Sequence, residues 1–175
     1  MNTSYKGKPI AQAGRYLTFT LGEESYGFPV LKVREIIRLC PITPVPRMPA
    51  YVKGVINLRG TVIPVFDLRA KLQFATTSYG ERACIIVLQA TIPSRETTLI
   101  GAIVDAVEEV VHLSAAEIEA TPDFGGTPDT QCILGLATIK GGVKTLLNIE
   151  KIFRWRHNQN VSRIDLRRFS LPFLF

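Results

Sequence analysis

Val52-Lys-Gly-Val-Ile-Asn-Leu-Arg-Gly60 is an apolar run that ends in a basic residue and a glycine, and it returns as Ile133-Leu-Gly-Leu-Ala-Thr-Ile-Lys-Gly141. The two copies are offset by 81 residues, the separation of Gly54 and Gly135. Each copy leads through its last glycine into another short apolar run, which predicts one β-hairpin about Arg59-Gly60 and a second about 140–142. Phe66-Asp-Leu68 then matches Leu147-Asn-Ile149. The sequence therefore predicts a structural unit that is used twice.

A second repeated block lies before each of these segments. Residues 26–39 match residues 100–113 at an offset of 74, the separation of Gly27 and Gly101. The matched positions include Val30, Val33, Glu35 and Leu39 with Val104, Val107, Glu109 and Leu113. Chance similarity between apolar segments is the alternative, but two blocks in the same order favour duplication. Because neither copy carries an obvious catalytic group, we expect two similar subdomains that form an interaction scaffold.

The first half of the chain reads as short strands joined by turns. Residues 16–21 alternate and pair with 25–28 as a hairpin, whereas 30–37 are compatible with a short helix or a strand. Pro29 suits the first position of a helical turn. Four prolines between 41 and 49 predict an extended connection. Pro64 interrupts the second arm of the 51–66 hairpin and predicts a sheet edge or a bulge there.

The second half continues in the same way. Residues 83–88 and 97–111 read as strands, and 121–130 read as a loop. Ser114 is followed three residues later by Glu117, the order of a capping box. Residues 149–155 predict a short closing helix. Many short strands with turns between them favour an all-β fold of small barrels over a parallel α/β sheet.

Bulk composition indicates a globular chain without a membrane span. The sequence has 175 residues, of which 46% are hydrophobic, and no apolar run reaches the roughly 18 residues that cross a bilayer. Residues 1–14 are polar and lack the apolar core of a secretory signal. The three cysteines, Cys40, Cys84 and Cys132, are odd in number and widely spaced, which favours a reducing compartment over disulfides or a metal site. We expect Cys84 and Cys132 to be buried, and the protein to be cytoplasmic.

The net charge of +6 comes mostly from the end of the chain. Residues 1–150 hold 15 basic and 14 acidic side chains, a balance of +1, whereas residues 151–175 hold six basic side chains against one acid, a balance of +5. A nucleic-acid-binding domain is expected to carry its positive field on the folded body. Nucleic-acid binding by the basic tail is a competing hypothesis, which the near-neutral body and the absence of an aromatic stacking series disfavour.

Candidate catalytic residues are few. The two histidines, His112 and His157, lie in contexts typical of a strand end and a polar tail, and neither has the carboxylate neighbour of a catalytic triad. Glu108 and Glu109 are adjacent, so on a strand they point to opposite faces, and the Glu117/Glu119 pair is better read as a solvated edge. No Gly-Lys-Ser/Thr follows the glycines, which excludes a phosphate loop. The sequence predicts no enzyme, no cofactor and no metal site.

What remains is a protein-interaction surface. Glu35 and Arg59 are lone charges in apolar stretches, and arginine is favoured where a planar fork makes directional contacts with a partner. The alternative is that the Glu35 and Arg59 side chains are exposed to solvent and have no binding role. The apolar residues around these charges exceed the needs of one small barrel, and part of the set is expected to form a docking patch: Leu31, Val33, Ile36, Ile37, Val55 and Ile56.

These segments together resemble the CheW family of bacterial chemotaxis coupling proteins. The resemblance rests on Phe19-Thr-Leu-Gly-Glu-Glu-Ser-Tyr-Gly27, Val30-Leu-Lys-Val-Arg-Glu-Ile36, Val52–Gly60, Pro64-Val-Phe-Asp-Leu-Arg69, Gly101–Val110 and Leu147-Asn-Ile-Glu-Lys151. It covers about residues 15–153. The most specific block is Asn-Leu-Arg-Gly with Asp-Leu-Arg beyond it.

The resemblance implies two SH3-like five-stranded β-barrels that share a hydrophobic core, and no catalysis. It implies that the protein links the cytoplasmic tip of a methyl-accepting chemoreceptor to the regulatory domain of a CheA-type histidine kinase, at membrane-associated receptor arrays. The family's receptor contact corresponds to Val33 and Gly54, and its coupling acid and arginine to Glu35 and Arg59. Lys53 and Asn57 flank that patch. Independently, a side chain at position 54 would push a docking helix away.

The resemblance also sets the expected domain limits. We expect a lead-in over 1–14, a CheW-like domain of two intertwined β-barrel subdomains over 15–155 and a basic tail over 156–175. The tail departs from the family pattern, and its two interpretations are a mobile segment or a weak contact with an anionic membrane surface. A coupling protein of a pathway that controls twitching or a second messenger, in place of swimming, is the alternative function.

Overall fold

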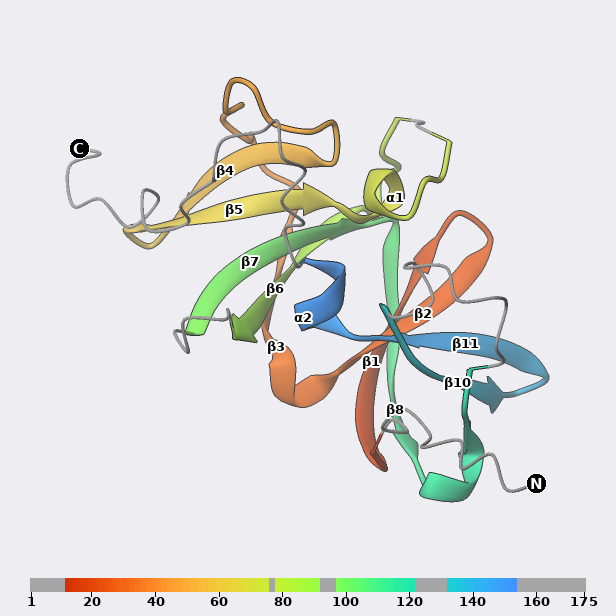
Figure 1. Ribbon diagram of the computed structural model, residues 1–175. Coiled ribbons are helices and arrows are strands. Elements are labelled where there is room, and N and C mark those ends of the chain that lie inside the picture. Colours follow the sequence, from red (N-terminus) through yellow and green to blue (C-terminus); the bar gives the residue numbers. More distant parts are fainter. Residues whose placement is uncertain (1–11, 76–77, 92–96, 122–131, 154–175) are drawn as a thin grey trace, which may run out of the picture.

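The computed structural model describes residues 12–75, 78–91, 97–121 and 132–153, and it is built almost entirely of short strands (Figure 1). The elements of the first repeat are β1 (Gly14–Leu21), β2 (Glu24–Pro29), the 3-10 turn η1 (Val30–Lys32), β3 (Val33–Arg38), β4 (Val52–Leu58), β5 (Thr61–Asp67) and α1 (Leu68–Lys71). Those of the second repeat are β6 (Cys84–Thr91), β7 (Thr97–Val104), β8 (Ala106–Leu113), η2 (Ala115–Glu117), β9 (Ile118–Glu119), β10 (Ile133–Ile139), β11 (Gly142–Leu147) and α2 (Ile149–Ile152). The fold is all-β, as predicted.

The strands form two sheets, and each sheet takes strands from both repeats. The first barrel has the order β8-β1-β2-β11-β10-β9, and the second has the order β3-β6-β7-β5-β4. Figure 1 shows the first barrel at lower right and the second at upper left, with α2 between them. The opening hairpin of each repeat therefore joins the later strands of the other repeat. The two predicted subdomains exist, and they are intertwined.

The register of strand pairing confirms the duplication. In the parallel pair β2–β11, Gly27 lies opposite Leu146, and in the parallel pair β5–β7, Gly101 lies opposite Val65. These four positions correspond under the two offsets of the sequence repeat. The β-bulge between Val52 and Gly54 likewise has its counterpart between residues 133 and 135.

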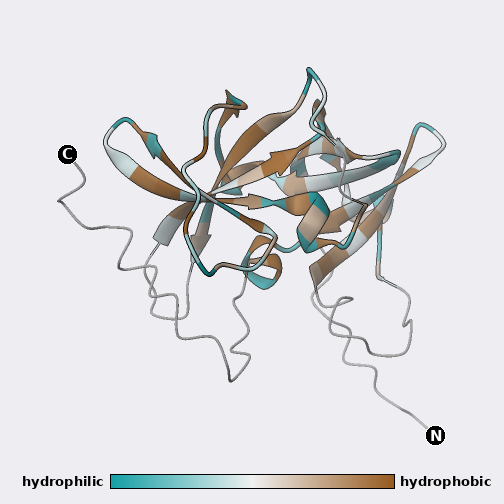
Figure 2. Cartoon of the chain, turned by 90° about the horizontal axis from the view of Figure 1, so that it is seen from above, coloured by the Kyte–Doolittle hydropathy of each residue, from teal (hydrophilic) through white to brown (hydrophobic). Residues whose placement is uncertain are grey.

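Three apolar clusters fill the molecule. One lies inside the first barrel around Tyr16 and Leu146, and one lies inside the second barrel around Ile63 and Ile85. The largest lies between the barrels and takes residues from β1, β2, β6, β7, α1 and α2. Figure 2 shows apolar residues along the strands in the middle of the molecule and polar residues at the hairpin tips. The predicted shared hydrophobic core is this third cluster.

Each barrel is closed by a short piece of chain that follows an edge strand. In the second barrel, Thr43 exchanges two backbone hydrogen bonds of 2.9 Å with Val55 on β4. In the first barrel, β9 pairs with β10, and Glu119 lies opposite Leu136, the repeat equivalent of Val55. The sixth strand of the first sheet is therefore the counterpart of the Thr43 bridge, and each barrel has the expected five principal strands.

Several local expectations are refined. Residues 30–37 contain both alternatives, a 3-10 turn after Pro29 and then β3. The predicted strand 97–111 is two strands separated at Asp105. The capping box of Ser114 and Glu117 is present. The closing helix occupies 149–152; Trp155 lies outside the described residues, as does most of the predicted loop 121–130.

Pro64 lies in β5, an interior strand of its sheet, so the expectation of a sheet edge was wrong. The other expectation was a bulge, and a bulge does lie nearby, in the partner strand β4. Val55 directs its own N–H and C=O to Thr43 and away from Pro64. The missing N–H of Pro64 therefore faces the β7 side, where pairing begins only at Val65. The bulge of the β4–β5 hairpin lies next to this position. Proline is tolerated because no ladder hydrogen bond is required of it.

Two cysteines are less buried than we expected. Cys84 and Cys132 are half-buried, as is Cys40. Burial raises the pKa of the Cys84 thiol, although a backbone hydrogen bond opposes the shift. Among the described helices, none is long and apolar enough to cross a bilayer.

Candidate partner-binding site

The predicted charges Glu35 and Arg59 meet at one edge of the second barrel. The Arg59 Nη2 donates to Glu35 Oε1 at 2.6 Å. β3 and β4 are the first and last strands of their sheet, so the curl of the barrel brings them together. The Arg59 side chain is 73% exposed, and such an ion pair contributes only about 0–1 kcal/mol to stability. Arginine has five N–H donors, so donors remain for a partner after Glu35 has fixed the guanidinium.

The β4–β5 turn holds Arg59 in place. Arg59 and Gly60 have φ values of 50° and 86°, positive at both central residues as in a type I′ hairpin turn. Asn57 Oδ1 accepts a hydrogen bond of 2.8 Å from the Gly60 N–H. Asn57 is itself exposed, and its side chain shapes the turn that presents the arginine.

Gly54 lies beneath the patch, not on its surface. It is buried, its φ is 141°, and a Cβ there would lie 1.9 Å from the carbonyl oxygen of Thr43. The space above Gly54 is therefore filled by the chain itself, in the segment that closes the barrel. This packing accounts for a glycine here without a docked helix.

Lys53 forms a long ion pair with the buried Asp67 and is also partly exposed to solvent. Its Nζ lies 3.8 Å from Asp67 Oδ2, and its side chain is 39% exposed. Asp67 also accepts a 2.6 Å hydrogen bond from the Tyr79 hydroxyl and caps the N-terminus of α1. Burial, followed by this hydrogen bond to Asp67, raises the pKa of Tyr79 above its ordinary value. Lys53 thus balances a buried carboxylate as well as facing solvent.

The expected apolar patch is smaller than its sequence suggested. Leu31 is 93% exposed and Ile36 is 45% exposed. Val33 is half-buried against the shared core, and Ile37 and Val55 are also half-buried. Ile56 is buried inside the second barrel, so it does not belong to the exposed part of the set. The exposed members of the expected set are therefore Leu31, in the turn before β3, and Ile36, on β3.

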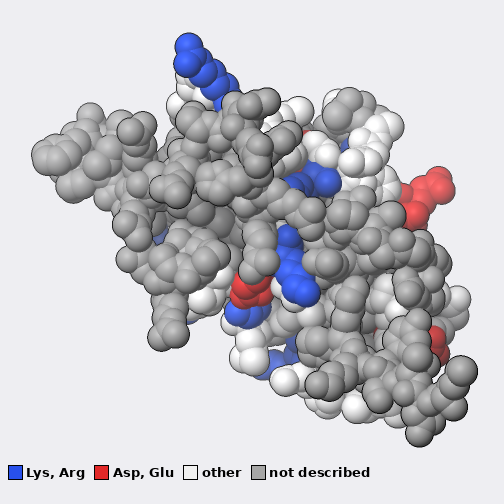
Figure 3. Space-filling view, viewed as in Figure 1, with Lys and Arg blue, Asp and Glu red and all other residues white. Residues whose placement is uncertain are grey.

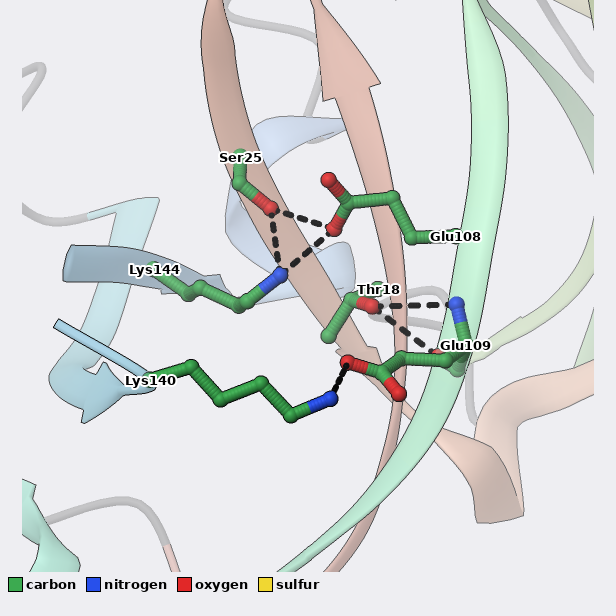
Figure 4. Close-up of polar contacts among 6 residues, drawn as sticks. All are labelled: Thr18, Ser25, Glu108, Glu109, Lys140 and Lys144. Carbon is green, nitrogen blue, oxygen red and sulfur yellow. Dashed lines mark hydrogen bonds and ion pairs between the residues drawn. The ribbon is translucent and has the colours of Figure 1, made fainter. Parts of the chain in front are cut away.

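The first barrel carries a second acid–base pair that we did not predict. Lys140 Nζ lies 3.5 Å from Glu109 Oε1, and these residues are the repeat equivalents of Arg59 and Glu35 (Figure 4). The repeat itself, carried to these two positions, would have revealed the pair. Both basic residues occupy the positive-φ position of their hairpin turn, with φ values of 50° and 49°.

Next to this pair, Glu108 is the acid of a separate cluster. Lys144 donates to Glu108 Oε2 at 2.6 Å and Ser25 donates to the same oxygen at 2.6 Å (Figure 4). Burial by itself raises the pKa of Glu108, but the hydrogen bonds from Lys144 and Ser25 outweigh it and hold that pKa below its ordinary value. Glu108 and Glu109 therefore pair with different lysines.

The described residues contain no group of three or more histidines, cysteines, aspartates or glutamates that could hold a metal ion. The polar side chains of the patch are engaged: Glu35 with Arg59, Asn57 with the Gly60 N–H, and Lys53 with Asp67. What the arrangement offers chemically is an exposed arginine whose position is fixed by Glu35, which suits a protein contact.

Comparison with known proteins identifies the fold. Residues 15–157 match the family described as the CheW-like domain. A chemotaxis protein CheW of Klebsiella aerogenes is 36% identical over 146 residues, which cover 83% of this chain and 84% of the relative. A chemotaxis protein CheW of Rhizobium meliloti is 34% identical over 147 residues, covering 83% of this chain and 92% of the relative.

Among solved structures, the crystal structure of the scaffolding protein TtCheW from Thermoanaerobacter tengcongensis superposes with a TM-score of 0.72 at 29% identity. The match covers 83% of this chain and 95% of that protein. With the family match over most of its length and the intertwined barrels described above, the chain belongs to the CheW-like domain family.

Proposed function

We propose that this protein is a non-enzymatic adaptor of chemotaxis signal transduction, which couples chemoreceptors to a CheA-type histidine kinase. The observation that carries the proposal is the solvent-facing Arg59, held by Glu35 and by a positive-φ turn in a CheW-like domain. Stability does not require this exposed pair. An exposed directional donor, with Leu31 and Ile36 exposed on and just before the strand that carries Glu35, is what a partner surface would use.

The mechanism is positional and involves no reaction. A receptor helix bundle places an apolar face near β3 and the β4–β5 turn, and a separate face holds the kinase regulatory domain. The receptor can bias the kinase only if the assembly has at least two arrangements that the receptor binds differently. Val33, Glu35, Lys53, Asn57 and Arg59 are the proposed partner-binding residues.

Gly54 joins this set through its packing. It lets residues 43–44 cover β4 and so sets the shape of the adjacent surface. The names of the Klebsiella and Rhizobium relatives favour a chemotaxis adaptor over one for twitching or second-messenger output. Acting on receptors, the protein would reside in the cytoplasm at membrane-associated receptor arrays.

The domain limits of 15–155, with a lead-in over 1–14 and a basic tail over 156–175, remain part of the proposal. The tail lies outside the described residues, and its sequence pairs arginines with a final Leu-Pro-Phe-Leu-Phe. Basic residues beside terminal aromatics suit a weak contact with anionic lipid. Removal of residues 157–175 should reduce binding to phosphatidylserine vesicles at low salt, and unchanged binding would dismiss this contact.

The direct test of the adaptor is co-sedimentation with a receptor cytoplasmic fragment and the kinase from the same organism. We expect Arg59→Glu to keep the native fold by circular dichroism and to weaken assembly at least about tenfold, because it places two carboxylates together and removes the donor. Lys140→Glu is the matched control, the same change at the equivalent turn of the first barrel. Normal assembly of Arg59→Glu would refute the site.

A further inference from the structure

Asp67 carries a buried charge that its helix cap does not require. Its side chain is 7% exposed, and its Oδ1 accepts hydrogen bonds from the N–H groups of Arg69 and Ala70 at the start of α1. Asn148, the repeat equivalent of Asp67, caps α2 with a neutral amide, whose Oδ1 accepts from the Lys151 N–H at 3.2 Å. Asparagine and aspartate are about equally good caps, and a buried carboxylate is costly to desolvate. The charge of Asp67 therefore serves something other than the cap.

The repeat indicates which residue accompanies this charge. Lys53 and Asp67 correspond to Leu134 and Asn148, so the base and the acid are both replaced by neutral residues in the other copy. Lys53 and Leu134 each occupy the β-bulge of their hairpin. Lys53 Nζ lies 3.8 Å from Asp67 Oδ2, whereas Leu134 packs against the apolar cluster of the first barrel. The buried carboxylate is thus present where the bulge carries a lysine and absent where it carries a leucine.

The Lys53 ammonium group is held by this charge without being hydrogen-bonded to it. A separation of 3.8 Å is close enough for charge attraction and too long for a hydrogen bond. Within the described part of the chain Lys53 donates no hydrogen bond, whereas Lys32 and Lys144 donate to their acids at 2.6 Å. Paired cations are common on this surface, and in Figure 3 basic side chains flank an acidic one near the middle of the visible face. Lys53 differs from Lys32 and Lys144 because its three N–H donors remain available to a partner.

Tyr79 fixes the carboxylate oxygen that faces Lys53. Its hydroxyl donates to Asp67 Oδ2 at 2.6 Å, and its ring centroid lies 6.0 Å from Lys53 Nζ, at the limit of a cation–π contact. The other carboxylate oxygen is fixed by the cap of α1. The acid is therefore held at both oxygens, and Lys53, whose side chain is 39% exposed, is the partner that faces solvent.

The outer face of β4 leads from Lys53 to the turn that carries Arg59. Burial alternates along this strand, and Lys53 and Asn57 are exposed positions six and two residues before Arg59. Arg59 pairs with Glu35 of β3, and Lys53 pairs with Asp67 at the end of β5. Each end of this face thus presents a cation that an acid from another strand holds in place.

We infer that Asp67 is a positioning residue of the partner-binding site, whose negative charge holds the Lys53 ammonium group where it donates to an acceptor oxygen of the receptor. The inference rests on the proposed function, which counts Lys53 among the partner-binding residues and places the receptor near β3 and the β4–β5 turn. A lysine that is already held loses less side-chain freedom on binding than an unrestrained one. The competing role of Asp67 is stability alone, in which case its effect on binding does not depend on Lys53.

The experiment is a double-mutant cycle on binding of the full chain to a receptor cytoplasmic fragment from the same organism. Lys53→Leu and Asp67→Asn give each position the residue of its repeat equivalent, and the double variant installs the pair found in the first barrel. We expect Lys53→Leu to weaken receptor binding at least about fivefold and Asp67→Asn about threefold. The double variant should bind within about twofold of Lys53→Leu, because Asp67 then has nothing left to position.

Two controls accompany the cycle. Asn148→Asp makes the converse change at the other cap and should leave receptor binding within about twofold of the unchanged chain. The proposed function assigns the kinase regulatory domain to a separate face, so Lys53→Leu and Asp67→Asn should both bind that domain as the unchanged chain does. Urea unfolding shows whether each variant is folded under the conditions of the binding assay.

Two further measurements keep the test independent of a folding defect in Asp67→Asn. Tyr79→Phe retains the ring and removes the donor to Asp67, and it should weaken receptor binding only when Lys53 is present. NMR relaxation of the Lys53 Cε needs no partner, and the side chain should become more mobile in Asp67→Asn while that of Lys140 does not change.

Several results would overturn the inference and leave the adaptor function standing. These are receptor binding by Asp67→Asn equal to that of the unchanged chain, an equal loss with and without Lys53, unchanged mobility of the Lys53 side chain, or weaker binding of the kinase domain by Asp67→Asn. Failure of the unchanged chain to bind the receptor fragment would instead refute the proposed function, and this inference with it.

Discussion

Gly54 and Thr43 approach each other more closely than a side chain at position 54 would allow. A Cβ would lie 1.9 Å from the Thr43 carbonyl oxygen and 2.7 Å from its carbonyl carbon, and the φ of 141° disfavours other residues. Thr43 cannot move away without breaking the two hydrogen bonds that it exchanges with Val55. The glycine is thus part of the closure of the second barrel.

We expect Gly54→Ala to lower the free energy of unfolding by about 2–4 kcal/mol, since the backbone strain and the broken closure add together. Gly80→Ala is the control, because a Cβ at Gly80 meets nothing within 4 Å. Urea unfolding of both variants provides the measurement. Equal stability of Gly54→Ala and the unchanged chain would show that residues 43–44 do not cover β4 as described.

At this scale the sequence could single out residues but not their contacts. Glu35 and Arg59 stood out as lone charges, and the structure pairs them. Gly54 was singled out for a reason the structure does not support. The link from Lys53 to Asp67 and Tyr79 joins segments far apart in the chain, so no local pattern could reveal it.

At the scale of elements, each short helix forms an ion pair with a residue just before an edge strand, and the two pairs have opposite polarity. Arg69 of α1 lies 3.5 Å from Asp105, just before β8, and Glu150 of α2 lies 2.6 Å from Lys32, just before β3. Asp105 also accepts a 2.6 Å hydrogen bond from the Gly22 N–H in the β1–β2 turn. The α1 pair is less exposed than the α2 pair.

We therefore expect Asp105→Ala to cost about 1–3 kcal/mol, because it removes the acceptor of the Gly22 N–H and the carboxylate that pairs with the mostly buried Arg69. Glu150→Ala should cost about 0–1 kcal/mol, as for other exposed ion pairs. Chemical denaturation of the two variants measures the difference. If both changes proved equally mild, the Asp105 connection would not hold the barrels together.

The cluster around Glu108 predicts how the first barrel responds to acid. Because the pKa of Glu108 is held below its ordinary value in the folded state, its contribution to stability is present above the unfolded pKa of about 4.3 and is lost as the pH falls through the folded value. Glu108→Gln should thus flatten the loss of stability below about pH 4.5. The unfolding midpoint between pH 3 and pH 7 tests this, with Glu23→Gln in the exposed β1–β2 turn as the control. Identical pH curves for Glu108→Gln and the unchanged chain would contradict it.

Elements that depend on interactions between neighbouring residues could be predicted from the sequence, and elements without such interactions could not. The Arg59-Gly60 turn and the Ser114 capping box depend on neighbouring residues, and both are present. Residues 30–37 combine Val, Ile and Glu, which do not discriminate helix from strand, and the structure uses both. Pro64 led us to expect a sheet edge, because the sequence could not show that β5 pairs with β7 only from Val65 onward.

At the scale of the whole molecule, the repeat in the sequence indicated the duplication, whereas the intertwining of the two barrels was implied only by the family resemblance. The repeat offsets identify equivalent positions such as Gly27 and Gly101. They are equally compatible with two separate barrels and with barrels that each borrow a hairpin from the other repeat. Only long-range pairing distinguishes the two, and β2–β11 and β5–β7 are the pairs that decide it.

Because of this exchange, the two barrels should unfold as one unit. The shared core takes residues from both sheets, and neither barrel keeps its strands if one repeat unfolds. We expect a single calorimetric transition whose calorimetric and van't Hoff enthalpies agree. Two resolved transitions would mean that each barrel is stable alone.

A core substitution provides the sharper form of this test. Ile63 is fully buried inside the second barrel and contributes to neither of the other two clusters. Ile63→Ala should cost about 2–5 kcal/mol. If unfolding is global, amide hydrogen exchange in the most protected positions of β10 in the first barrel should accelerate as much as in β4 of the second. Acceleration confined to β4 and its neighbours would show that the barrels open independently, and that the hairpins exchanged between them do not transmit the loss of stability.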